Sequence, residues 1–313
     1  MIQRRVLLFG ECMLELQGQA FGAMHQTYGG DTLNTAVYLA RCGGASGIQV
    51  GYATGLGDDS LSEGMMQRWA AEGLDLSAVR RIPGRLPGLY LIEVDERGER
   101  RFSYWRDASA ARAYFDAETT PLEQGLAGWD ALYLSGISLA ILPPAGRERL
   151  FALMQALRDR GATVVFDNNF RPRLWPDLAQ ARECYTRAFE LASIALVTAD
   201  DHQALLGLAT LKDAVAAAQA LPTPELVIKR GAASTLVRGA GDGWHEAPTE
   251  AVLQVIDTTA AGDSFAAGYL SRRLAGSSAL DAARFGNRLA ARVIQHRGAV
   301  IAPALMADLL TGT

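Results

Sequence analysis

The sequence predicts an α/β protein built on a mainly parallel sheet. Short apolar runs alternate with amphipathic segments over most of the 313 residues, and this alternation is typical of parallel strands joined by helices. We find no internal repeat, low-complexity tract or linker, and one β hairpin interrupts the series. Together these observations favour a single large domain, residues 1–313, that carries a small β lid.

The first half of the chain supplies the first strands and helices of this pattern. Val6–Gly10 is a short apolar run ending in glycine, which suits a buried parallel strand. Residues 55–60 resemble a dinucleotide fingerprint but lack its third glycine, so we interpret them as a turn. The other expected elements are a turn at 29–31, a helix at 33–41 ended by Gly43 and Gly44, a strand at 49–54 and a helix at 60–72.

The segment 86–106 breaks the alternation of strands and helices. Residues 89–94 and 101–106 predict two strands around a turn at 95–98, and they carry aromatic and charged side chains together. We interpret the hairpin as a lid over a ligand, with a further contribution from residues near 11–30. Its apolar strand face, Leu89, Leu91 and Ile92, is best covered by a second subunit, so we expect a homodimer or larger homo-oligomer.

The alternation resumes at Asp130 and continues to the end of the chain. We expect antiparallel additions to the sheet at 234–238 and 252–256. The other strands are expected at 131–136, 163–167, 194–197 and 226–229, and the helices at 146–160, 176–191, 262–274 and 278–296. Ligands of such sheets bind outside the carboxyl ends of the strands.

Composition excludes several classes of function. The net charge of −4 gives no basic surface for nucleic acid. No apolar stretch reaches the roughly 18 residues of a membrane helix, and the run after Arg5 is too short for a signal peptide. Cys12, Cys42 and Cys184 are widely spaced, which indicates free thiols. We therefore expect a cytoplasmic protein with no membrane partner.

Residues 257–265, Asp-Thr-Thr-Ala-Ala-Gly-Asp-Ser-Phe, carry the strongest chemical signal. Small residues at 260–262 allow close approach of a ligand, and the amides at a helix N-terminus bind anions. Asp263 in that first turn is well placed to accept a proton from an attacking hydroxyl. By itself, the spacing also fits a helix-capping aspartate.

This segment resembles the C-terminal signature of the ribokinase-like (phosphofructokinase-B type) carbohydrate kinases, and residues 29–36, Gly-Gly-Asp-Thr-Leu-Asn-Thr-Ala, resemble the N-terminal signature. Within the family, the likeness to kinases of 2-keto-3-deoxygluconate runs essentially end to end. Segments that carry it are 10–13, 86–90, 104–106, 134–138 and 166–175. The resemblance implies a three-layer α/β/α sandwich with a β lid, and phosphorylation of this sugar acid by ATP with Mg²⁺.

The resemblance also implies roles for single residues. Asp263 would be the catalytic base, Ala260, Ala261 and Gly262 the anion-hole amides, and Arg171 a group between substrate and ATP. The implied substrate site comprises Gly30, Asp31, Asn34, Tyr90, Tyr104, Arg106, Arg171 and Asp263. The implied ATP site comprises Asn169, Arg171, Lys229, Gly231, Ser234, Asn287 and the three anion-hole residues.

Two arginines favour an acidic substrate, because arginine is the usual bidentate partner of a carboxylate. Arg106 lies in an aromatic lid strand and Arg171 follows the strand that ends at Asp167, so both could converge on one site. A kinase for a neutral sugar such as fructose or ribose, a dinucleotide-dependent oxidoreductase and a non-catalytic nucleotide sensor are the alternatives.

The sequence departs from the family pattern at two places. The family often has Asn-x-x-Glu after the strand at 194–197, but residues 198–202 read Thr-Ala-Asp-Asp-His. Asp200 or Asp201 could join a Mg²⁺ shell through water, and we assign no direct metal ligand. The usual glycine at position 260 is alanine. Some relatives bind a monovalent cation near 257–259, and this question stays open for the present chain.

Overall fold

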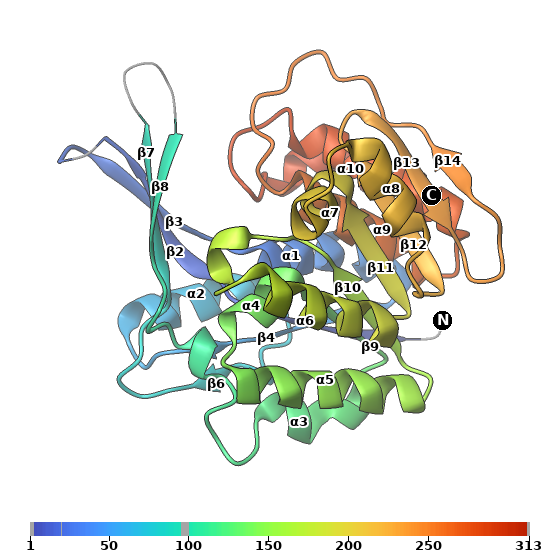
Figure 1. Ribbon diagram of the computed structural model, residues 1–313. Coiled ribbons are helices and arrows are strands. Elements are labelled where there is room, and N and C mark those ends of the chain that lie inside the picture. Colours follow the sequence, from blue (N-terminus) through green and yellow to red (C-terminus); the bar gives the residue numbers. More distant parts are fainter. Residues whose placement is uncertain (1–2, 20, 95–99, 312–313) are drawn as a thin grey trace.

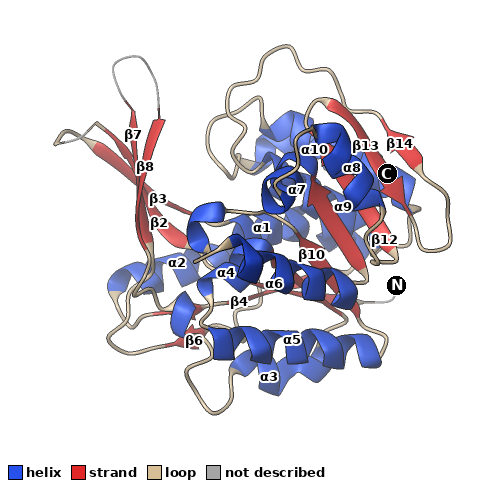
Figure 2. Ribbon diagram, viewed as in Figure 1, coloured by secondary structure: helices blue, strands red, loops and turns tan. Residues whose placement is uncertain are grey.

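The computed structural model describes residues 3–19, 21–94 and 100–311. Its main body has three layers, with helices on both sides of a central sheet, and a small second sheet projects from one side (Figure 1). Figure 2 shows the same division between the red strands of the sheets and the blue helices around the larger one. The predicted α/β architecture with a mainly parallel sheet and a β lid is therefore confirmed.

The central sheet has eight strands in the order β14-β13-β12-β11-β10-β9-β1-β4. Its six parallel strands are β1 (Arg4–Phe9), β4 (Ile48–Ala53), β9 (Ala131–Ser135), β10 (Thr163–Asp167), β11 (Ile194–Thr198) and β12 (Glu225–Arg230). At one edge, β13 (Ala233–Arg238) and β14 (His245–Ala247) run antiparallel. A separate pair, β5 (Gly55–Leu56) and β6 (Arg80–Arg81), lies outside this sheet.

Alternate side chains of each strand enter the two hydrophobic cores. Leu7 and Phe9 of β1 pack in one core, whereas Val6 and Leu8 pack in the other. The first core is covered by α3 (Pro121–Gly125), α4 (Gly136–Ile141), α5 (Pro144–Asp159), α6 (Leu178–Leu191), α7 (Ala199–Leu206) and α8 (Leu211–Gln219). The second is covered by α1 (Asp31–Gly43), α2 (Ser60–Ala71), α9 (Ala261–Arg273), α10 (Ala279–Val293) and α11 (Ala307–Thr311). Continuous burial on both faces explains why these strands read as apolar runs.

The lid is a four-stranded sheet with the order β3-β2-β7-β8. It consists of β2 (Met13–Gly18), β3 (Met24–Gly29), β7 (Leu89–Val94) and β8 (Arg100–Trp105), and β2 pairs in parallel with β7. The predicted hairpin is confirmed, while residues 95–98 of its turn lie outside the described residues. Ile92 is buried and Leu89 is half-buried, so the exposed apolar side chains on the described strands of the lid are instead those of Met24, Phe102, Tyr104 and Trp105.

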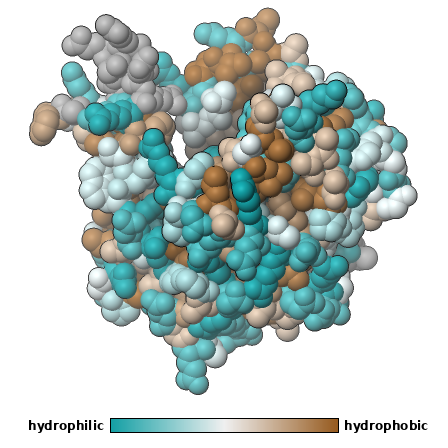
Figure 3. Space-filling view, viewed as in Figure 1, coloured by the Kyte–Doolittle hydropathy of each residue, from teal (hydrophilic) through white to brown (hydrophobic). Residues whose placement is uncertain are grey.

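One predicted strand is wrong. Residues 252–256 form a loop, in which Leu253, Val255 and Ile256 are exposed. The antiparallel edge of the sheet is occupied by β14 instead, which leaves the apolar run at 252–256 without a strand to pair with. This loop forms part of the apolar surface at the top of the main body in Figure 3. Within the described residues, no helix is both long and apolar enough to cross a bilayer.

Candidate active site

A cavity of about 440 Å³ lies where the lid meets the carboxyl ends of the parallel strands. Strand ends contribute Asp167, Thr198 and Lys229, the lid contributes Glu15, Tyr90 and Tyr104, and the start of α9 closes the wall. The sequence-predicted residues on this wall are Gly30, Asp31, Asn34, Tyr90, Tyr104, Asn169, Arg171, Asp201, Lys229, Ala260, Ala261, Gly262 and Asp263. The two signature segments, far apart in sequence, thus meet in one cavity.

Asp263 lies in the first turn of α9 and faces this cavity. Its Oδ2 accepts a 2.8 Å hydrogen bond from Nδ2 of Asn34 in α1. The hydroxyl of Thr35, one turn into α1, donates to the main-chain oxygens of both Asp31 (3.0 Å) and Asp263 (3.3 Å). These contacts hold the two helix N-termini together and fix the direction of the Asp263 carboxylate.

The cavity raises the pKa of Asp263 to about 7. Burial is the largest cause, because it penalises the charged carboxylate. The negative charges of Asp31 and Asp167 act in the same direction, while the bond from Asn34 and the charge of Lys229 oppose them. A carboxylate with a pKa near neutrality is suited to accept a proton at physiological pH.

Asp31 is a second, half-buried carboxylate of the cavity, and it begins α1. Its Oδ2 accepts a 2.6 Å hydrogen bond from Nδ2 of Asn169, a residue in a left-handed backbone conformation with φ of 20°. Burial raises the pKa of Asp31, and the bond from Asn169 opposes this shift. At the neighbouring Gly30, an added Cβ would lie 2.2 Å from the carbonyl oxygen of Glu11, so only glycine fits there.

Lys229 is the best-buried cation of the described cavity wall. Its Nζ lies 2.9 Å from Oδ2 of Asp167, and the two side chains are 12% and 5% exposed. Lys229 lies near the carboxyl end of β12 and Asp167 at that of β10, the two strands on either side of β11. The Lys229 ammonium also faces the start of α9, so it is in position to bind an anionic ligand there.

The start of α9 has the geometry of an anion site. Ala260 adopts a left-handed conformation with φ of 60°, and α9 begins at Ala261. The N–H of Ala261 donates to the carbonyl of Thr258 at 3.2 Å, whereas those of Gly262 and Asp263 lie in the first turn, where a helix supplies no acceptor. Alanine at position 260 therefore adopts a left-handed turn that usually favours glycine, and two first-turn amides stay available to an anion.

The lid presents aromatic rings to the cavity. Tyr90 and Tyr104 stack with ring centroids 6.0 Å apart, and Phe102 stacks on Tyr104 at 6.3 Å. The Tyr90 hydroxyl donates to the carboxylate of Glu15, and burial together with this neighbouring charge raises the pKa of Tyr90. Rings of this kind can cover a sugar and exclude water while leaving polar edges for its hydroxyl groups.

The two arginines predicted to meet the substrate lie in different environments. Arg106 forms an ion pair with the fully buried Glu11 at the root of the lid, and it is not on the cavity wall. The convergence of Arg106 and Arg171 is thus not seen. Arg171 does line the cavity, is 51% exposed and lies 3.3 Å from Asp201. Nε of Arg106 is buried without a partner among the described residues.

Three predicted nucleotide contacts lie off the cavity wall. Gly231 is the turn after β12, and Ser234 bonds to Arg230 and Glu246 on the outer strands. Asn287 is buried in α10 and donates to the carbonyls of Ala247 and Pro248. Their roles toward ATP stay predictions.

The predicted acidic pair after β11 divides between two environments. Asp201 lines the cavity, and burial raises its pKa against the opposing charge of Arg171. Asp200 is exposed and off the wall. The described residues contain no cluster of three metal-binding side chains. Single carboxylate oxygens such as those of Asp201 still fit Mg²⁺, which binds proteins through few carboxylates and keeps several waters.

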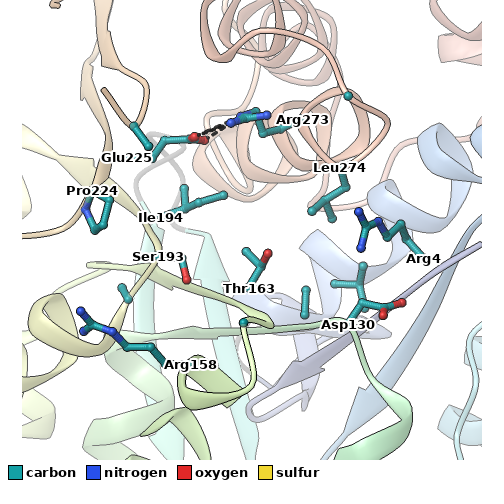
Figure 4. A pocket seen from close by; sticks show the side chains of 16 residues that line it. Arg4, Asp130, Arg158, Thr163, Ser193, Ile194, Pro224, Glu225, Arg273 and Leu274 are labelled. Carbon is teal, nitrogen blue, oxygen red and sulfur yellow. Dashed lines mark hydrogen bonds and ion pairs between the residues drawn. The ribbon is translucent and has the colours of Figure 1, made fainter. Parts of the chain in front are cut away.

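Sequence reasoning missed Glu15, Gln17, Asp167 and Phe102 as lining residues. Asp167 had a usable signal, because it ends a buried strand at the edge where ligands bind. Glu15 and Gln17 lie in the segment near 11–30 that was expected to contribute to the lid, but its strand β2 was not identified, so no side chain could be assigned to the cavity. A second cavity, of about 470 Å³, lies at the opposite, amino-terminal ends of the strands (Figure 4). There Arg273 is already paired with Glu225, and the ligand-binding edge of such a sheet is the other one.

The chain is similar to known proteins over almost its whole length. Residues 3–305 match the family described as pfkB family carbohydrate kinase. The chain is 46% identical over 303 residues to a 2-dehydro-3-deoxygluconokinase of Escherichia coli (strain K12), covering 96% of this chain and 98% of that protein. It is 44% identical over 304 residues to the 2-dehydro-3-deoxygluconokinase of Dickeya dadantii (strain 3937), with the same coverage. The structure of aminoimidazole riboside kinase from Salmonella enterica, solved with aminoimidazole riboside and an ATP analogue, has a TM-score of 0.81 at 25% identity, and covers 98% of this chain and all of that one.

Proposed function

The chain belongs to the pfkB family of carbohydrate kinases, and from this premise we propose that it transfers the γ-phosphate of ATP to 2-keto-3-deoxygluconate (2-dehydro-3-deoxygluconate). The product is 2-keto-3-deoxy-6-phosphogluconate. The observation that carries the proposal is identity above 40% to kinases of this sugar acid over almost their whole length, together with a cavity in which Asp263 faces the amides of α9.

The first step is activation of the attacking hydroxyl. Asp263 accepts the proton of the primary alcohol, and Asn34 keeps its carboxylate directed into the cavity through the 2.8 Å bond. The stacked tyrosines of the lid exclude water around the reacting atoms, which limits transfer of the phosphoryl group to water.

The negative charge on the transferred group is met by positive groups of the chain. The first-turn amides of α9 and the ammonium of Lys229 both face the cavity. A protein of this fold from Escherichia coli was solved with ATP and Mg²⁺, and such an ion would supply further neutralisation of the phosphate oxygens here. Asp201 is our candidate for holding it through water. We make no assignment for a monovalent cation.

The carboxylate of the sugar acid needs a fixed cation, and Arg171 is our candidate because its guanidinium is half exposed on the cavity wall. Arg106 remains a second candidate only if its pair with Glu11 rearranges. We also propose a homodimer formed through the lid, supported by the exposed Phe102 and Trp105, and a cytoplasmic location, where ATP is available.

The test is an ADP-release assay with Mg-ATP that compares 2-keto-3-deoxygluconate with fructose and ribose. We expect turnover of the sugar acid alone. Preference for a neutral sugar would overturn the substrate while leaving the kinase reaction, and absence of turnover with all three would overturn the reaction itself. If an Arg171→Leu variant kept full activity on the sugar acid, the proposal that Arg171 binds the substrate carboxylate would be wrong.

A further inference from the structure

The charge of the catalytic cavity is unusual for a site that binds two anions. The described wall carries the carboxylates of Glu15, Asp31, Asp167, Asp201, Asp257 and Asp263, but only two cations, Arg171 and Lys229. Each of those cations is already paired, with Asp201 and Asp167 respectively. Asp31 and Asp263 therefore line the same cavity, and no cation of the described wall is paired with either of them.

The main chains at the two aspartates are held together by the fold. Asp31 begins α1, Asp263 lies in the first turn of α9, and the hydroxyl of Thr35 bonds to the main-chain oxygens of both. The donors to each carboxylate are neutral: Asp31 accepts from Nδ2 of Asn169 at 2.6 Å, with Ser135 and the N–H of Thr32 also lowering its pKa, and Asp263 accepts from Nδ2 of Asn34 at 2.8 Å. Neutral amides stabilise a carboxylate less than a cation does, so two full negative charges here are unfavourable.

We propose that Asp31 sets the protonation of the catalytic base, so that at neutral pH Asp31 and Asp263 hold one proton between them. Like charges in a shared buried site separate into one acidic and one basic carboxyl. This inference rests on the proposed kinase reaction and adds a positioning and tuning role to Asp31. The negative charge of a bound substrate favours retention of the shared proton. Asp263 must nevertheless be deprotonated to act as the base during turnover.

The other charged groups around Asp263 do not offset the effect of the Asp31 charge on its protonation. The charged or titratable side chains that act on it are Asp31 from α1, Asp167 from β10 and Lys229 from β12, with Tyr133 of β9 and Tyr38 of α1 as neutral neighbours. Asp167 and Lys229 bind each other, so their charges largely cancel at Asp263. Asp31 is the carboxylate whose charge is not cancelled, and it is the charge that raises the pKa of Asp263 most.

The test compares the pH dependence of kcat/KM for the sugar acid in the wild-type protein and the Asp31→Asn variant. In the wild type, activity should fall below an apparent pKa of about 7. Without the charge of Asp31, we expect this acid limb to move down by about one pH unit. At pH 6 the activity relative to its own plateau should then rise about fivefold. The plateau itself will fall, because Asp31 also faces the substrate, so each profile is normalised to its own maximum.

Two control variants separate tuning from other effects. Asp31→Glu keeps the charge and should keep the wild-type limb. Asp159→Asn changes the net charge equally on the exposed end of α5, outside the cavity, and should shift nothing. Because ATP titrates in the same pH range, only the difference between variants is interpreted. An Asp31→Asn limb that coincides with the wild-type limb, or an equal shift in Asp159→Asn, overturns the proposal.

A second measurement needs no turnover. Carbon-13 NMR of aspartate carboxyl groups in the wild-type protein should show the Asp263 and Asp31 signals each responding to two coupled steps, one of them near pH 7. Loss of a signal in Asp263→Asn gives the assignment. Single, independent steps for both groups near the ordinary aspartate value would overturn the proposal even if Asp31→Asn failed to fold. A wild type without kinase activity but with coupled steps would instead refute the proposed function alone.

Discussion

The ion pair between Glu11 and Arg106 gives a sharp test of how the lid is fixed. The Arg106 side chain is 9% exposed and that of Glu11 is 0% exposed, and the hydroxyl of Ser109 binds the other oxygen of the carboxylate. Glu11 follows β1, whereas Arg106 follows β8, so this contact joins the two places where the chain enters and leaves the lid. Glu11→Gln preserves the shape of the side chain and removes only its charge.

Loss of one partner leaves a buried guanidinium without its counter-charge, which typically costs 3–5 kcal/mol. Because the glutamine oxygen can still accept one hydrogen bond, we expect about 3 kcal/mol of lost unfolding free energy. In urea unfolding with a slope near 3 kcal/mol/M, the midpoint should fall by about 1 M. The measurement is tryptophan fluorescence across a urea series for both proteins.

The matched control is Glu148→Gln, which breaks an ion pair to Arg187 whose side chains are 64% and 44% exposed. Such a surface pair contributes less than about 1 kcal/mol. If Glu11→Gln lost no more stability than Glu148→Gln, the pair would not anchor the lid. Arg106 would then be free for the substrate carboxylate, as the sequence predicted.

Three further outcomes are expected. Asp263→Asn should lower kcat about 10²–10⁴-fold while calorimetry still detects ATP binding, and undiminished turnover would exclude it as the base. Arg171→Leu should reduce kcat/KM for the sugar acid about 100-fold, whereas the same change at the exposed Arg173 should have little effect; equal losses would point to a non-specific cause. Burial lowers the pKa of His202 to about 4, so the folded protein resists protonation there and stability should fall by up to about 3 kcal/mol as pH drops from above 6.5 to 4. His202→Leu should flatten that part of the denaturation profile, and an unchanged profile would contradict the assignment.

Most of the fold was predictable because buried strands and amphipathic helices leave different periods in the sequence. The runs at 163–167 and 194–197 were found within one residue of β10 and β11. The error at 252–256 has a physical cause, since an apolar run becomes a strand only where a sheet edge is free, and β14 occupies that edge. Whether a segment pairs as a strand depends on the whole sheet, so it cannot be predicted from a run of five residues.

The site was predictable where a local motif fixes backbone geometry. Asn34 and Asp263 belong to such motifs, and the structure places them in contact. Arg106 shows the limit of this reasoning, because its partner Glu11 lies 95 residues earlier and no spacing rule connects the two. A buried guanidinium must find a counter-charge, but sequence alone does not say which carboxylate supplies it.

The contact between Asn34 and Asp263 spans 229 residues of chain. During synthesis, α1 is therefore made long before α9, the helix that carries the base. The contact between Asn34 and Asp263 can form only after α9 has been made. Contacts of such separation form late, since closing a long loop costs entropy before any interaction repays it. Kinase activity thus reports completion of the chain, and a truncated product that ends before residue 261 can keep much of the sheet yet has no helix with which to hold a phosphate.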